Sequence, residues 1–170
     1  REYFVLRSGR AQMIIQADRA DLGPAFTYLI FDAQNARQSQ RKERAFNFVP
    51  DKGFASSALE VILGGFPFTA LGHRTETYWT LYDGIPAVEA IWWAGGIRVV
   101  ERIFGLEGIG AFQRSITLEG AHLIGPESVK LRLSLPAGEI RQQGSILFWS
   151  SSGAQLGLAV PGNPPEVHIQ

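Results

Sequence analysis

Hydrophobic and polar residues alternate along the middle of the chain, from Arg74 to Leu135. The clearest run has an apolar residue at every second position, namely Val129, Leu131, Leu133 and Leu135. Successive side chains on a strand point to opposite faces, so this pattern gives each strand one dry face and one wet face. The pattern predicts an antiparallel β-sandwich.

Similar runs, separated by glycine and proline clusters, predict about 11 or 12 strands. The expected strands are residues 12–17, 26–32, 58–63, 68–73, 74–82, 87–94, 97–106, 111–119, 128–135, 145–149, 155–160 and 166–169. Residues 1–6 are also strand-like, and residues 34–44 form a polar excursion without an apolar stripe. We therefore expect one large all-β domain over residues 1–170, supersandwich-like and with little helix.

Two glycine-containing pairs between these runs predict hairpin turns. Asp83-Gly84 and Gly95-Gly96 supply residues that tolerate the positive φ angles of a type I′ turn. Residues 97–106 also fit helical spacing, but their flanking glycines and β-branched content favour a strand. We expect that strand to carry a bulge near Val99-Val100.

Composition excludes several classes of function. The chain has 16 basic and 16 acidic residues, and this balance argues against nucleic acid or an anionic membrane as a partner. It has no cysteine, which removes disulfides, thiolate nucleophiles and thiolate metal ligands. The sequence starts and ends in strand-like segments without an initiator methionine, so we expect it to be part of a longer polypeptide.

Metal, phosphate and serine-nucleophile sites find no support in the motifs. His73, His122 and His168 are scattered, without the spacing that directs two imidazoles at one ion. There is no G-x-S-x-G elbow, and the glycine-rich residues 105–110 lie between two strand-like runs with no helix after them. We expect no metal and no cofactor, and a hairpin loop at residues 105–110.

Carboxylates are the only candidates for catalysis. If the Asp83-Gly84 turn is symmetric, Glu76 lies opposite Ile91 and diagonal to Glu89. Diagonal residues are about 7–8 Å apart, a separation that an inverting pair of carboxylates can use. Glu76, Glu89 and Asp83 are therefore weak catalytic candidates; the competing interpretation is a wet sheet face on which Arg74 and Arg98 balance the acids.

Aromatic residues are the best candidates for ligand binding. Trp92 and Trp93 are adjacent on one expected strand, so they face opposite sides of the sheet. Exposed aromatic rings stack on the apolar faces of sugars, and Tyr78 and Tyr82 lie on the preceding strand. Trp92, Trp93, Tyr78 and Tyr82 are thus candidate carbohydrate contacts; the alternative is that both tryptophans are buried in the core or at a domain interface.

The same segment resembles a known domain. DGIPAVEAIWWAGGIRVVERIF (residues 83–104) and AFQRSITLE (residues 111–119) resemble the N-terminal supersandwich domain of bacterial glycoside hydrolases whose catalytic part is an (α/α)6 barrel. In those enzymes the catalytic carboxylates lie on the barrel. The resemblance implies a non-catalytic partner of a catalytic domain in the same polypeptide, and a periplasmic or secreted bacterial location.

Three functions remain open at this point. The first is an accessory module of a carbohydrate-active protein that packs on a catalytic domain and contacts glycan. The second is an independent β-sandwich glycoside hydrolase or polysaccharide lyase that uses the surface carboxylates. The third is a purely structural or interaction module.

Overall fold

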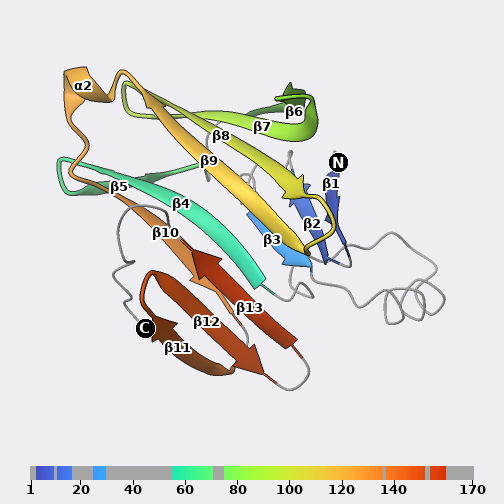
Figure 1. Ribbon diagram of the computed structural model, residues 1–170. Helices are drawn as coiled ribbons and strands as arrows, with labels where there is room; N and C mark the ends of the chain where they lie inside the picture. Colours follow the sequence, from blue (N-terminus) through green and yellow to red (C-terminus); the bar gives the residue numbers. More distant parts are fainter. Residues whose placement is uncertain are drawn as a thin grey trace. The chain divides into compact units, whose positions relative to one another are not determined.

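A computed structural model describes residues 3–9, 11–16, 25–29, 55–70, 75–135, 137–151 and 154–159. The chain divides into two compact units, Arg1–Ser134 and Leu135–Gln170, which are described separately below. The fold is all-β and antiparallel, as the alternation predicts (Figure 1). None of the described helices is long and apolar enough to span a membrane.

A four-stranded antiparallel sheet carries the central part of the first unit. Its strands follow one another in chain order: β6 (Glu76–Tyr82), β7 (Ile85–Ala94), β8 (Ile97–Leu106) and β9 (Ala111–Glu119). Asp83 and Gly84 have φ angles of 50° and 81°, as a tight turn with two left-handed residues requires. The predicted hairpin at Asp83-Gly84 is confirmed. Residues 107–110 connect β8 to β9, so Gly105 and Leu106 of the expected loop belong to β8 instead.

A second sheet of the first unit has six strands. β1 (Tyr3–Ser8), β2 (Ala11–Gln16), β3 (Ala25–Leu29), β4 (Ala55–Leu63) and β10 (Ser128–Ser134) lie side by side in that order. The sixth strand, β5 (Phe66–Thr69), also pairs with β4. A one-turn helix, α2 (Ala121–Ile124), connects β9 to β10.

The two sheets pack face to face around two apolar clusters. Each cluster combines residues of both sheets: Phe4, Leu6, Met13 and Ile15 pack with Val88, Ala90 and Ile103, and Leu59 and Val61 pack with Trp92, Ala94, Ile97 and Val99. This pairing of two apolar faces is the sandwich that the alternation predicts. Val88, Ala90 and Trp92 therefore mark the inner face of β7.

A polar network interrupts this apolar interior. Glu101 lies on β8 between Val99 of one cluster and Ile103 of the other, and its side chain is almost fully buried. It accepts hydrogen bonds from Trp92 Nε1 at 2.6 Å and from Arg114 Nε at 2.7 Å, and a second bond from the Arg114 guanidinium. The buried charge is thus paired and hydrogen-bonded, as its desolvation demands.

One corner of the sandwich is closed by Ser8 at the end of β1. The Ser8 hydroxyl donates to the Leu106 carbonyl oxygen and accepts from the Ala111 backbone N–H at 3.0 Å. The backbones approach so closely here that a Cβ on Gly105 would lie 2.4 Å from the Arg7 carbonyl oxygen. Only a glycine fits at position 105.

The second unit contains a three-stranded antiparallel sheet of β11 (Glu139–Gln143), β12 (Ile146–Ser151) and β13 (Ala154–Ala159). Leu147 and Trp149 of β12 are buried on one face of this sheet. Phe148, between them, points to the opposite face and is partly exposed.

Several expectations need correction. The pairing of β8 with both neighbours runs without interruption through Val99 and Val100, so there is no bulge there. β11 and α2 were not predicted at all. At the second hairpin, Gly95 has a φ of 58° while Gly96 does not lie in the left-handed region. The expected strand at residues 166–169, and the excursion at residues 34–44, lie outside the described residues.

Candidate functional site

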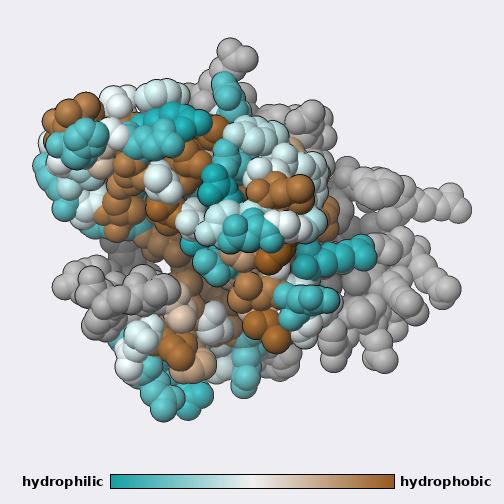
Figure 2. All heavy atoms as spheres, turned by 45° about the horizontal axis from the view of Figure 1, so that its top comes forward, coloured by the Kyte–Doolittle hydropathy of each residue, from teal (hydrophilic) through white to brown (hydrophobic). Residues whose placement is uncertain are grey.

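The candidate site is the outer face of the four-stranded sheet, which we define as the side opposite the core. On β7, Glu89, Ile91 and Trp93 belong to this face because they alternate with core residues. Strand pairing places Tyr78 and Arg102 on either side of Glu89, and places Arg98 opposite Trp93. Figure 2, which turns the upper part of Figure 1 forward, shows polar and apolar side chains interspersed over this region.

One row across the sheet is a hydrogen-bonded cluster around Glu89. The Tyr78 hydroxyl donates to Glu89 Oε1 at 2.5 Å, and Arg102 Nε donates to Oε2 at 2.9 Å. The Arg102 guanidinium also forms an ion pair with the same oxygen. Both oxygens of the Glu89 carboxylate are therefore engaged by neighbours on β6 and β8.

These contacts set the protonation states of the cluster. Burial raises the pKa of Glu89, but the hydrogen bonds from Tyr78 and Arg102 outweigh it and the net pKa is lowered. The hydrogen bond to Glu89 raises the pKa of Tyr78, and burial raises it further. At neutral pH the cluster consists of an ionised glutamate, a neutral phenol and a cationic guanidinium.

Aromatic packing extends this cluster toward the Asp83-Gly84 turn. The Tyr82 ring stacks on Phe104 with centroids 5.2 Å apart, and the Arg102 guanidinium carbon lies 5.4 Å from the Tyr82 centroid. The distance is short enough for a cation–π contact. Tyr82 therefore supports Arg102, and part of its ring surface is already covered by protein.

A second row contains the exposed tryptophan. Trp93 is 51% exposed, whereas Trp92 is fully buried in the core. Beside Trp93, Arg98 Nη1 donates to Glu119 Oε2 at 2.5 Å, and this hydrogen bond raises the pKa of Arg98. The structure thus leaves Trp93 as the member of the pair that can present its ring to a ligand.

The predicted candidates fall into three groups. Tyr78, Tyr82, Glu89 and Trp93 share the outer face, with Tyr78 beside Glu89 and with Tyr82 and Trp93 toward opposite ends of β7. Glu76 lies opposite Ile91 and diagonal to Glu89, which is the register expected from the turn. Asp83 occupies the turn itself with a positive φ, and Trp92 lies on the inner face.

Charge pairing differs from the expected one. Glu89 pairs with Arg102 and Arg98 pairs with Glu119, whereas Arg74, the other expected balancing residue, lies outside the described residues. Arg102 and Glu119 were missed as members of the site. Counting back from the Gly95-Gly96 turn places Arg102 opposite Glu89, so the sequence did contain a signal for this pair.

Among the described residues no group of histidine, aspartate and glutamate side chains is arranged to hold a metal ion. Comparison with protein-family models, with curated proteins and with solved structures finds no match for the chain.

Proposed function

We propose that this chain is a non-catalytic β-sandwich module of a bacterial carbohydrate-active polypeptide. Its outer face contacts glycan, and the module packs on a catalytic domain of the same polypeptide. The observation that carries the proposal is the exposed Trp93 ring beside the Arg98–Glu119 ion pair, with Tyr78 41% exposed on the same face. The resemblance of residues 83–104 and 111–119 to a glycoside hydrolase sandwich domain supports the same class.

Sugar binding suits this combination of side chains. An indole ring offers a large apolar face to the C–H groups of a sugar ring. Ion-paired side chains keep oriented hydrogen-bonding groups at the surface, because each charge is held by its partner. Trp93 and Glu89 are four residues apart on β7, so about 13 Å of strand separates the two rows, and an extended ligand can contact both.

The state of Glu89 argues against the hydrolase or lyase alternative. A general acid has to be protonated at the working pH, but the pKa of Glu89 is lowered. A nucleophile or general base needs a lone pair directed at its substrate or water, and the hydrogen bonds from Tyr78 and Arg102 take up most of the lone pairs of Glu89. Glu89 is better suited to fixing Arg102 and Tyr78 in place.

Apolar side chains at one end of the first unit support packing on another domain. The β4–β5 turn, the β7–β8 turn and α2 meet at this end (Figure 1). Gly65 N–H donates to Glu127 Oε1 at 3.0 Å, and Ile124 packs over Gly96. Phe66, Leu123 and Ile124 are exposed there, and exposed apolar groups that gather on one surface are typical of interfaces.

The proposal is tested with a glycan array and a pooled chromogenic glycoside assay on the same 170-residue chain. We expect binding without turnover. Trp93→Ala should weaken the affinity for a bound glycan about threefold to tenfold, because an aromatic stacking contact contributes about 0.5–1.5 kcal/mol. The melting temperature should fall by no more than a few degrees, since Trp93 lies outside the core.

Trp79→Ala is the matched control. Trp79 is 53% exposed but belongs to the opposite side of the sheet, where its ring contacts Phe4. The Trp79→Ala substitution should leave the affinity for glycan unchanged. Three results would each contradict the proposal: turnover of a glycoside by the wild-type chain, no binding to any glycan on the array, or equal losses of affinity in Trp93→Ala and Trp79→Ala.

A further inference from the structure

The three-stranded sheet of the second unit has a polar and aromatic face unrelated to the site described above. Strand pairing aligns Arg141 on β11, Phe148 on β12 and Gly157 on β13 in one row across this sheet. Gln143 lies one row to one side of Phe148, and Gln155 one row to the other. Neighbouring rows on one face are about 7 Å apart, so the two amides flank the aromatic ring.

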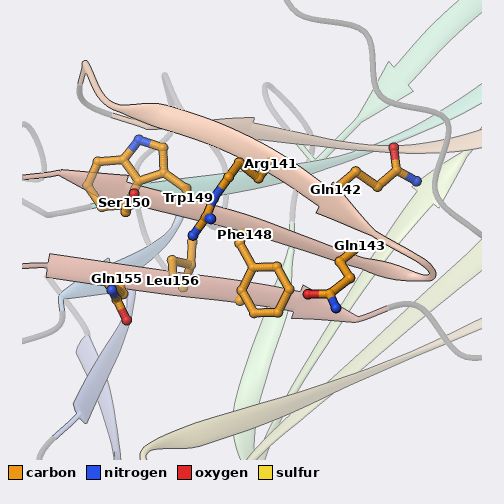
Figure 3. Close-up of a pocket in the computed structure, with 9 residues that line it drawn as sticks. Arg141, Gln142, Gln143, Phe148, Trp149, Ser150, Gln155 and Leu156 are labelled. Atoms are coloured by element: carbon orange, nitrogen blue, oxygen red, sulfur yellow. The ribbon is translucent and has the colours of Figure 1, made fainter.

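An open depression of about 550 Å³ lies on this face, and these five residues line it (Figure 3). Phe148 and Gln143 project to the same side of the sheet in Figure 3, while Gln142 projects to the other. Gln142, Trp149, Ser150 and Leu156 complete the lining. Its volume is within the range of small-molecule binding sites.

Gly157 leaves the face of the Phe148 ring open. A Cβ at position 157 would lie 3.9 Å from two ring carbons of Phe148, in ordinary contact with the ring. Every larger residue would extend into the space beside the ring. Gly157 does not have a positive φ, so no strain in the backbone requires a glycine at this place. The missing side chain instead provides access to Phe148, which is 37% exposed.

The polar groups around the ring are available to a ligand. Arg141, Gln143 and Gln155 are exposed, and among the described residues none of their side chains forms a hydrogen bond or ion pair. Glu139 belongs to the same face as Arg141, so one negative charge offsets one positive charge. This balance favours a neutral ligand with many hydroxyl groups over an anion.

We propose that this depression binds a ring of a neutral saccharide. The sugar stacks on Phe148 in the space above Gly157, and its hydroxyls hydrogen-bond to the Gln143 and Gln155 amides and to Arg141. This site uses none of the residues of the outer face, so it is a second carbohydrate contact of the chain and stands or fails independently of the first.

The test is affinity electrophoresis of the full chain in gels that contain xyloglucan, galactomannan or arabinoxylan, with polygalacturonate as the anionic comparison. All variants carry Trp93→Ala, which weakens the contribution of the outer face equally in each of them. We expect at least one neutral polysaccharide to retard this parent. Gly157→Val should reduce the retardation most, by filling the depression, and Phe148→Ala should weaken it at least threefold.

Ile146→Ala is the matched control, because Ile146 lies on the same strand and face with the same exposed fraction as Phe148 but outside the lining. It should be retarded like the parent. Folding of the valine variant is checked by its melting temperature, which should be unchanged since valine suits a strand. Absence of retardation by every neutral polysaccharide, retardation by polygalacturonate alone, or equal retardation of Gly157→Val and the parent would overturn the inference. If Gly157→Val and the parent are retarded equally, the outer face is tested separately by comparing the wild-type chain with Trp93→Ala alone. Weaker binding by Trp93→Ala in that comparison would still support the outer-face proposal.

Discussion

The buried Glu101 network makes a sharp prediction about stability. The side chains of Glu101 and Arg114 are only 1% and 7% exposed, and Trp92 Nε1 donates to the same carboxylate. Arg114→Met leaves an uncompensated charge in the core, which costs about 3–5 kcal/mol. Domains are stable by about 5–15 kcal/mol, so this one substitution removes a large part of the free energy of unfolding.

The double variant Glu101→Leu, Arg114→Met should be more stable than either single variant. It removes both charges and leaves the Trp92 N–H without its acceptor, at a cost of about 1–3 kcal/mol. Urea unfolding followed by tryptophan fluorescence measures all three free energies. In a domain of this size the single variants should also lower the melting temperature by on the order of 10 °C.

Arg98→Met provides the comparison on the same sheet. The Arg98 and Glu119 side chains are 34% and 50% exposed, so solvent screens their ion pair and its loss should cost far less stability than Arg114→Met. The reasoning is refuted if Arg114→Met costs no more than Arg98→Met. It is also refuted if the double variant loses the sum of the two single losses, because a real pair is not additive.

Two further predictions concern pH and packing. The pKa of Glu89 is lowered, so the loss of unfolding free energy caused by Glu89→Gln should become smaller below about pH 4.3. The pKa of Tyr78 is raised, so the loss caused by Tyr78→Phe should become smaller above about pH 10. Urea titrations at a series of pH values measure both losses. Differences that stay constant with pH would contradict these shifts. Gly105→Ala should cost about 1–3 kcal/mol because its Cβ would clash with the Arg7 carbonyl oxygen, while Gly157→Ala should change stability by less than about 0.5 kcal/mol. Equal values for the two glycines would show that the close approach at position 105 is absent.

The alternation of apolar and polar residues was sufficient to predict the strands in which it occurs. β8 and β9 begin and end at the predicted residues, and the Asp83-Gly84 turn gave the correct register of β6 and β7. β11 was not predicted because Glu139–Gln143 is polar at four of five positions, so its sequence shows no apolar face. α2 was not predicted because a single helical turn is too short to show a helical period in the sequence.

The site was only partly predictable, for a related reason. Alternation required Trp92 and Trp93 to face opposite sides, but it did not say which side was the core. β7 is apolar on both faces, since Ile91 is buried on the outer side as Ala90 is on the inner. Glu101 shows the converse: a charged residue in a strand is normally assigned to the wet face, and only Arg114 and Trp92 explain its burial.

The order of the strands has a consequence for how the chain folds. β6 to β9 form a meander in which every strand pairs with its neighbour in sequence through a short turn. In the six-stranded sheet, by contrast, β10 pairs with β4, which is distant in sequence. Ser8 at the end of β1 likewise bonds to the β8–β9 hairpin across a long stretch of chain. Contacts that close short loops form earliest, because less chain entropy is lost. We therefore expect the meander to form first and to serve as the template on which the other sheet assembles, so that the rows of the outer face are in register before the rest of the sandwich has closed.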